Sequence, residues 1–218
     1  MSTHLLPCLE IGAAREEAEL CVLLMHGLGA DGHDFEDVAS ALSQAALPRQ
    51  WRFVLPHAPQ QPVTINMGMV MPAWYDILDM SQSREVNWDT VAESGARIEA
   101  LIENEKAQKL VLAGFSQGAA MALHVGLRRQ DSIAGILMMS GYLLENAEHP
   151  CPPMSTDFPI AIYHGSADPV VPLAAAEQSL ATLETQGYSP SFKVYDAMEH
   201  SLCDEEIRDV FAWLSALA

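Results

Sequence analysis

The sequence predicts an α/β fold in which helices cover both faces of a mostly parallel central sheet. Short apolar runs alternate with helical patterns along the whole chain, a rhythm typical of strands joined by crossover helices. The runs are apolar at consecutive positions, which suits strands that are buried on both faces. A length of 218 residues, of which 50% are hydrophobic, fits a single domain spanning residues 1–218 with one sizeable core.

Six apolar runs are the expected strands of this sheet. The first run stops at Gly27 and the second at Pro56, as strands do where a turn begins. The last run is shorter and more polar, so we expect it near an edge of the sheet. The six runs cover residues 19–25, 51–55, 109–113, 133–139, 158–163 and 192–195.

Five amphipathic patterns between these runs predict helices. In the second pattern, apolar residues recur on one side and glutamates on the other. Pro172 suits the first turn of the fourth helix, and acidic residues open the fifth. The expected helices cover residues 34–46, 90–106, 117–129, 172–186 and 204–217. Residues 58–82 do not follow the alternation of strands and helices, and a long excursion from it of this kind more often has a function than none.

Composition excludes several classes of partner. The net charge is −18, from 11 basic and 29 acidic side chains. Such a surface repels phosphate backbones and anionic headgroups, so we expect no nucleic-acid partner and no stable membrane insertion. No signal peptide is visible, and no apolar run approaches the ~20 residues of a membrane span. The cysteines form no C-x-x-C pair and are expected to be reduced thiols of a cytoplasmic protein; they are Cys8, Cys21, Cys151 and Cys203.

The pentapeptide Gly114-Phe-Ser-Gln-Gly118 predicts a nucleophilic serine. It follows an expected strand and precedes an Ala-rich helix. A serine at such a sharp turn adopts a strained backbone, and its hydroxyl projects above the sheet at a helix N-terminus. We therefore expect Ser116 to attack an acyl carbon, with the Gln117 amide stabilising the negative charge that develops.

His200 is the expected general base, because it lies in the loop after the last strand, where a parallel sheet gathers its site. His164, at the end of a strand, is the rival, although a buried ring held by backbone groups explains it better. We expect His124 to be a packed helix residue and His149 to lie in a solvated loop.

Asp168 is the expected partner of the base, in a turn after the strand at 158–163. Such a carboxylate fixes the imidazole tautomer and stabilises the imidazolium. Asp196 is the alternative, since it is closer to His200 in sequence.

The glycine-rich stretch 25–32 is expected to supply a second oxyanion donor, the amide of Leu28. It contains neither a full G-x-G-x-x-G pattern nor a Gly-Lys pair, which argues against dinucleotide or Walker-type binding.

Eight segments together resemble the phospholipase/carboxylesterase family of bacterial carboxylesterases and acyl-protein thioesterases. They occur in the family's order along nearly the whole chain: His26–Gly29, Pro56–Pro59, Pro62–Asn66, Ala73–Ile77, Gly114–Gly118, His164–Asp168, Val170–Pro172 and Glu199–His200. The resemblance implies a compact α/β-hydrolase fold without a large lid domain. It also implies the triad Ser116, Asp168 and His200, the oxyanion amides of Leu28 and Gln117, no cofactor, and the possibility of a homodimer.

The resemblance implies hydrolysis of short- to medium-chain carboxylic esters through an acyl-enzyme, with thioesters or lysophospholipids as further substrates. Candidates to line an acyl groove, each of which could equally pack in the core, are Met67, Met69, Met71, Trp74, Val171, Met198 and Leu202. Thioester hydrolysis as the main activity, an amidase or lyase using the same triad, and a non-catalytic binding protein stay open as alternatives. A metallohydrolase is disfavoured, because no histidine cluster has metal-ligand spacing.

Overall fold

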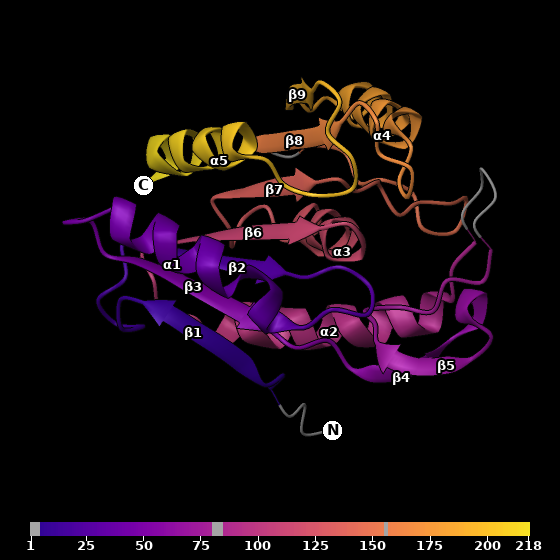
Figure 1. Cartoon of the computed structure of the whole chain (residues 1–218), viewed down its shortest axis with the longest axis horizontal. Coiled ribbons are helices and arrows are strands. Elements are labelled where there is room, and N and C mark those ends of the chain that lie inside the picture. The colour runs from indigo at the N-terminus through magenta and orange to yellow at the C-terminus, as the bar shows by residue number, and fades with distance from the viewer. Residues whose placement is uncertain (1–4, 80–84, 155–156) are drawn as a thin grey trace.

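A computed structural model describes residues 5–79, 85–154 and 157–218, and its main feature is a seven-stranded sheet (Figure 1). The strand order is β1-β3-β2-β6-β7-β8-β9. β1 pairs antiparallel with β3, and the other neighbouring pairs of this sheet are parallel. The strands are β1 (Cys8–Gly12), β2 (Leu20–Met25), β3 (Trp51–Pro56), β6 (Lys109–Phe115), β7 (Gly135–Met139), β8 (Ile160–Gly165) and β9 (Ser191–Tyr195). The predicted mostly parallel sheet is confirmed.

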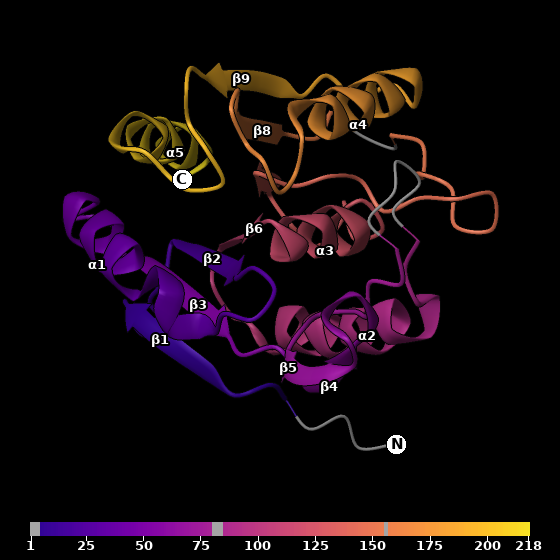
Figure 2. The ribbon, with the colours of Figure 1, turned by 45° about the vertical axis from the view of Figure 1, so that its right-hand side comes forward.

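Helices form a layer on each face of the sheet, as predicted (Figure 2). Helices α1 and α5 pack on one face, and α2, α3 and α4 pack on the other. Their bounds are α1 (Glu36–Ala45), α2 (Trp88–Asn104), α3 (Gln117–Gly126), α4 (Leu173–Thr185) and α5 (Asp204–Leu217), and a short 3-10 turn, η1 (Gly32–Phe35), precedes α1. None of the described helices combines the length and the apolar character that a bilayer crossing requires.

The continuous apolar runs are explained by burial on both faces. Along β2, Cys21 and Leu23 belong to the core cluster beneath α2 and α3, whereas Val22 and Leu24 belong to the cluster beneath α1 and α5. Every residue of β2 is buried, so no polar position interrupts the run. This is the pattern expected of a central parallel strand.

Sequence patterns locate most elements but miss some. All six expected strands occur, and β9 is indeed an edge strand. The helix expected to reach residue 129 ends at Gly126, and Pro172 is the N-cap of α4 rather than part of its first turn. Strand β1 was not expected, nor was the hairpin of β4 (Gln60–Val63), the 3-10 turn η2 (Thr64–Asn66) and β5 (Met69–Pro72). This hairpin occupies much of the 58–82 excursion, whose residues 80–82 lie outside the described part of the chain.

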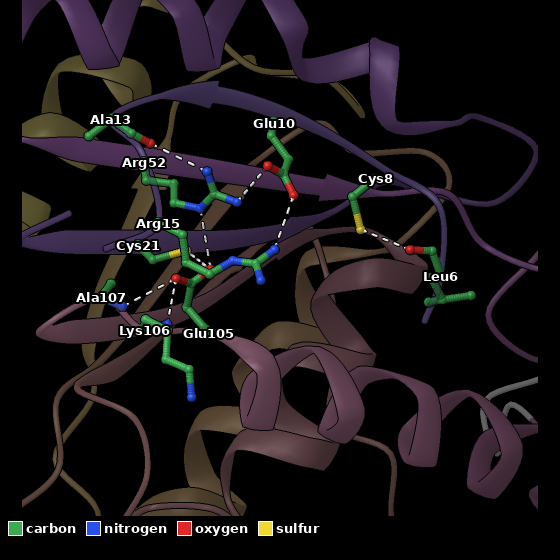
Figure 3. A network of polar contacts seen from close by, with 10 residues as sticks. All are labelled: Leu6, Cys8, Glu10, Ala13, Arg15, Cys21, Arg52, Glu105, Lys106 and Ala107. Atoms are coloured by element: carbon green, nitrogen blue, oxygen red, sulfur yellow. Dashed lines mark hydrogen bonds and ion pairs between the residues drawn. The ribbon is translucent and has the colours of Figure 1, made fainter. Parts of the chain in front are cut away.

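An ion-pair network centred on the buried Arg52 fastens the edge strand β1 to its neighbours (Figure 3). Arg52 of β3 is only 4% exposed, and its Nη2 lies 2.7 Å from Glu10 Oε2 of β1. Its Nε lies 3.3 Å from Oε2 of Glu105, the C-cap residue that follows α2, and its Nη1 donates to the carbonyl of Ala13. One guanidinium therefore connects β1, β3 and α2, and removing one partner would leave a buried charge uncompensated.

Loops that follow the parallel strands converge at one edge of the sheet. Residues 26–31 follow β2, Ser116 follows β6, Asp168 lies in the loop after β8, and His200 lies in the loop after β9. The carboxyl ends of parallel strands share an edge, and open α/β sheets bind their ligands there.

Candidate active site

Ser116 occupies a strained turn between β6 and α3. Its backbone has φ 55° and ψ −118°, outside the regions that ordinary residues favour. A Cβ at Gly114 would collide with the Gly118 carbonyl, and a Cβ at Gly118 would collide with the Met25 carbonyl oxygen of β2. Both glycines of the pentapeptide are therefore required sterically, because side chains there would open the turn that presents the serine.

The glycine-rich loop after β2 approaches this turn. A Cβ built on Gly27 would lie 3.4 Å from the Ser116 Cβ, in van der Waals contact. Among the described residues, the main-chain N–H groups of Leu28 and Gln117 make no hydrogen bond, and Gln117 begins α3, where amides lack intrahelical partners. Two donors are thus available near the serine for an oxygen that gains negative charge.

His26 supports this loop, a role the sequence analysis missed. Its ring is buried, with Nδ1 2.8 Å from the Gly27 carbonyl, and its Nε2 accepts the Ala58 N–H at 3.1 Å. Burial lowers the pKa of this imidazole, which favours the neutral ring that such a pair of contacts needs. A histidine directly before the first glycine of the loop was the available signal.

Asp168 and His200 meet across the loops that follow β8 and β9. Asp168 Oδ2 lies 2.7 Å from His200 Nδ1, and Asp168 Oδ1 accepts the N–H groups of Val170 and Val171 at 2.8 Å. Both oxygens of this buried carboxylate are therefore engaged. Asp196, the alternative acid, instead accepts the Ser166 hydroxyl at 3.3 Å. A carboxylate at Nδ1 leaves Nε2 as the proton acceptor of the ring.

The imidazole of His200 lies beside the serine turn without bonding to the hydroxyl. Its ring centroid is 4.7 Å from that of Phe115, the residue before Ser116. Among the described residues, no hydrogen bond joins Ser116 Oγ to His200 Nε2. Such contacts are often long without substrate and tighten in the bound complex. The side chain of His200 is 16% exposed, so a substrate can reach it.

The other candidate histidines have different partners. His164 is buried, with Nε2 2.8 Å from the Val171 carbonyl, as expected of a ring held by backbone, and 3.6 Å from Asp168 Oδ2. His124 packs near Trp88 and Arg128. His149 lies in a loop, as expected, but it is half-buried because its ring stacks on Trp88 at 4.1 Å between centroids. No group of three potential metal-binding side chains occurs among the described residues.

The seven candidate groove residues do not form one surface. Trp74 and Val171 are buried in the core cluster beneath α2 and α3, whereas Met198 and Leu202 pack in the cluster on the opposite face. On the hairpin, Met67 is 94% exposed and Met69 58% exposed. Met71 Sδ would lie 3.8 Å from a Cβ on Gly29, so this methionine borders the glycine-rich loop.

A cavity of about 480 Å³ lies between the loop before α2, the loop after β7 and helix α4. Its lining mixes apolar and polar side chains and includes none of the seven candidates: Leu78, Glu85, Val86, Trp88, Tyr142, Leu143, Leu144, Glu145, Asn146, Ala175, Gln178 and Ser179. Ser116, Asp168 and His200 do not line it. Tyr142 connects the two regions, because it follows Gly141, where a Cβ would lie 3.3 Å from the Ser116 carbonyl oxygen.

Known proteins resemble this chain along nearly its whole length. The profile of the phospholipase/carboxylesterase family matches residues 6–218. A protein named acyl-protein thioesterase 1 from Neurospora crassa is 36% identical over 215 residues, covering 92% of this chain and 87% of that protein. A protein of the same name from Gibberella zeae is 34% identical over 207 residues, covering 88% of each. The solved structure of Arabidopsis thaliana SOBER1 superposes with a TM-score of 0.82 at 26% identity, covering 92% of this chain and 99% of that one.

Proposed function

Because the chain belongs to the phospholipase/carboxylesterase family and is a serine hydrolase of the α/β-hydrolase fold, we propose that it hydrolyses acyl thioesters on protein cysteines. The sequence alone favours oxygen esters as the main substrate and thioesters as the alternative. The names of two fungal relatives that are 36% and 34% identical to this chain favour the thioester instead.

The proposed catalytic residues are Ser116, His200 and Asp168. The observation that carries this assignment is the 2.7 Å contact between Asp168 Oδ2 and His200 Nδ1 beside a serine with φ 55°. A carboxylate holding Nδ1 keeps the imidazole oriented and leaves Nε2 to take the serine proton. The N–H groups of Leu28 and Gln117 are the proposed oxyanion donors.

The proposed reaction has two steps that share one base. His200 Nε2 takes the proton of Ser116 as Oγ bonds to the acyl carbon, the C–S bond breaks, and the thiol leaves with the proton from His200. Water then attacks the acyl-enzyme with His200 again as base, which releases the carboxylic acid and restores the serine.

The cavity beside Tyr142 is the proposed site of the acyl chain. Its volume of about 480 Å³ falls within the ~300–1,000 Å³ range of small-molecule pockets. Leu78, Val86 and Leu144 supply apolar lining. Each methylene group that is buried there adds about 0.8 kcal/mol of binding, so longer acyl chains are expected to react more efficiently than acetyl.

The test compares leaving groups with the acyl chain held constant. One peptide sequence is prepared with the acyl group on a cysteine sulfur or on a serine oxygen, in chain lengths from acetyl to palmitoyl, beside p-nitrophenyl esters of the same acids. We expect kcat/KM to be about tenfold or more higher for the S-acyl peptide, a margin of about 1.4 kcal/mol in the barrier, and to rise with chain length.

Two controls define failure of this proposal. Ser116→Ala should abolish turnover of all substrates and prevent labelling by a fluorophosphonate, which reacts with activated serines. Equal or faster turnover of the O-acyl serine peptide than of the S-acyl cysteine peptide would make the protein a general carboxylesterase. An unlabelled Ser116 in the native protein would refute the serine mechanism itself.

A further inference from the structure

The segment Pro72–Tyr75 lies between the two halves of the proposed oxyanion site and bonds to both. The Pro72 carbonyl accepts the Gly29 N–H at 2.9 Å, and the Trp74 indole N–H donates to the His26 carbonyl at 2.8 Å. These two contacts flank the Leu28 amide along the chain. The segment therefore holds the glycine-rich loop on either side of one proposed donor.

The side chain of Gln117 fastens the same segment to the serine turn. Its Oε1 accepts the Trp74 N–H at 2.7 Å, and its Nε2 donates to the Tyr75 carbonyl at 2.8 Å. The side chain is only 2% exposed, so water cannot replace either contact easily. One end must accept and the other must donate, which an amide does at any pH, whereas an ionised carboxylate can only accept.

We propose that the Gln117 side chain is a positioning residue that sets the distance between the two oxyanion donors, the amides of Leu28 and Gln117. Gln117 thus acts twice: its main chain donates to the oxyanion, and its side chain aligns the opposite donor through Trp74. This inference rests on the proposed serine mechanism, but it does not depend on whether the natural substrate is an ester or a thioester.

The physical reason is the steep dependence of transition-state stabilisation on donor placement. A donor must lie about 2.7–3.1 Å from the oxyanion, and a displacement of about 1 Å can cost 10²-fold in rate. Substrate binding in the ground state depends much less on this alignment. Loss of the Gln117 side-chain contacts should therefore lower kcat and leave KM nearly unchanged.

Gln61 offers a matched control on the same segment. Its Nε2 donates to the Ala73 carbonyl at 2.6 Å, which is also a glutamine side-chain bond to the backbone of residues 72–75. Gln61 belongs to the hairpin strand β4 and bonds neither to the serine turn nor to the glycine-rich loop. A general disturbance of the segment should affect both variants, whereas loss of donor alignment should affect only Gln117.

The experiment measures kcat and KM for a p-nitrophenyl ester in Gln117→Met, Gln117→Glu, Trp74→Phe and Gln61→Met. It also measures the affinity of each variant for a trifluoromethyl ketone, which forms a tetrahedral adduct with the serine. We expect kcat to fall about 10- to 100-fold in Gln117→Met, with KM within about threefold and inhibitor affinity falling in parallel with kcat/KM. Trp74→Phe, which removes only the indole donor, should lower kcat about tenfold, and Gln61→Met should change kcat less than about threefold.

The inference is overturned if folded Gln117→Met keeps its kcat, if only its KM rises, or if its kcat equals that of Gln61→Met. If Gln117→Met does not fold, Trp74→Phe decides, since it removes only the indole N–H that donates to the His26 carbonyl. Gln117→Glu adds a pH test, because the ionised carboxylate keeps the acceptor for the Trp74 N–H but offers the Tyr75 carbonyl no donor, whereas the protonated acid restores both contacts. Failure of the serine mechanism gives a different result, because the native protein would then neither hydrolyse the ester nor bind the ketone.

Discussion

Two clusters in this protein each contain a buried charged side chain with a partner of opposite or complementary character, but they differ in what their partners leave exposed. At the sheet edge, the buried Arg52 is paired with the half-exposed Glu10 and with the buried Glu105. At the carboxyl ends of the strands, Asp168 is equally buried and paired, but its partner His200 is 16% exposed. The hydroxyl of Ser116 makes no hydrogen bond among the described residues.

The difference shows where buried charge stabilises and where it prepares chemistry. A network whose members satisfy one another resists change, because removing one member leaves another uncompensated. A network that ends in an exposed imidazole and an unbonded hydroxyl keeps those groups for a substrate. Substitutions in the two clusters should therefore separate activity from stability.

The largest expected effect is the loss of activity in Asp168→Asn. The asparagine Oδ1 can still accept the N–H groups of Val170 and Val171, but its NH₂ group faces His200 Nδ1 and imposes the wrong tautomer. We expect kcat to fall about 10³- to 10⁴-fold with little change in thermal stability. Steady-state kinetics and a melting curve measure both, with Asp196→Asn as the matched control. A larger fall in kcat for Asp196→Asn than for Asp168→Asn would instead identify Asp196 as the acid that pairs with His200.

Arg52→Met is expected to show the opposite pattern. It leaves the buried Glu105 without its cation, which should lower the free energy of unfolding by about 3–5 kcal/mol while kcat of the folded protein stays unchanged. Urea denaturation measures the loss. Replacing Glu105 by Met in the same protein should restore part of the stability, because it removes a buried unpaired charge. A parallel loss of kcat would show that the two clusters are coupled.

Glu206 is a third buried charged side chain, and it belongs to neither cluster. It lies in the first turn of α5, and neither carboxyl oxygen makes a well-aligned hydrogen bond among the described residues. Burial raises its pKa from an ordinary value of 4.5 to about 8, although the nearby Cys203 backbone opposes the shift. The folded protein therefore binds more protons at this group than the unfolded chain between about pH 4.5 and 8.

The sign of the expected effect follows from this difference in proton binding. The contribution of Glu206 to stability is complete below the unfolded pKa and is lost as pH rises through the folded value of about 8. Glu206→Gln removes this dependence, so the variant should gain about 1–3 kcal/mol relative to the native protein between pH 5 and pH 8.5. Denaturant unfolding at both pH values measures the gain. Glu205→Gln, at an exposed neighbour, is the control, and an equal pH dependence in native protein and Glu206→Gln would contradict the argument.

Sequence reasoning succeeded where a pattern is local and failed where a contact is not. The run at 19–25 becomes β2 because consecutive apolar residues suit a strand buried on both faces. Strand β1 escaped notice because its residues are only partly buried and it pairs at an edge with β3, far along the chain. The stacking of His149 on Trp88 also went unpredicted, because the two residues are distant in sequence.

The sequence by itself determined the α/β architecture, the turn at Ser116, and the family, because each is encoded in residues that are close neighbours along the chain. Only the tertiary structure decided which acid meets His200 and how the Gln117 side chain braces Trp74 and Tyr75. It also showed that the candidate groove residues lie in separate places. These outcomes depend on packing between distant segments, since a hydrogen bond forms only where the fold brings both partners within about 3 Å.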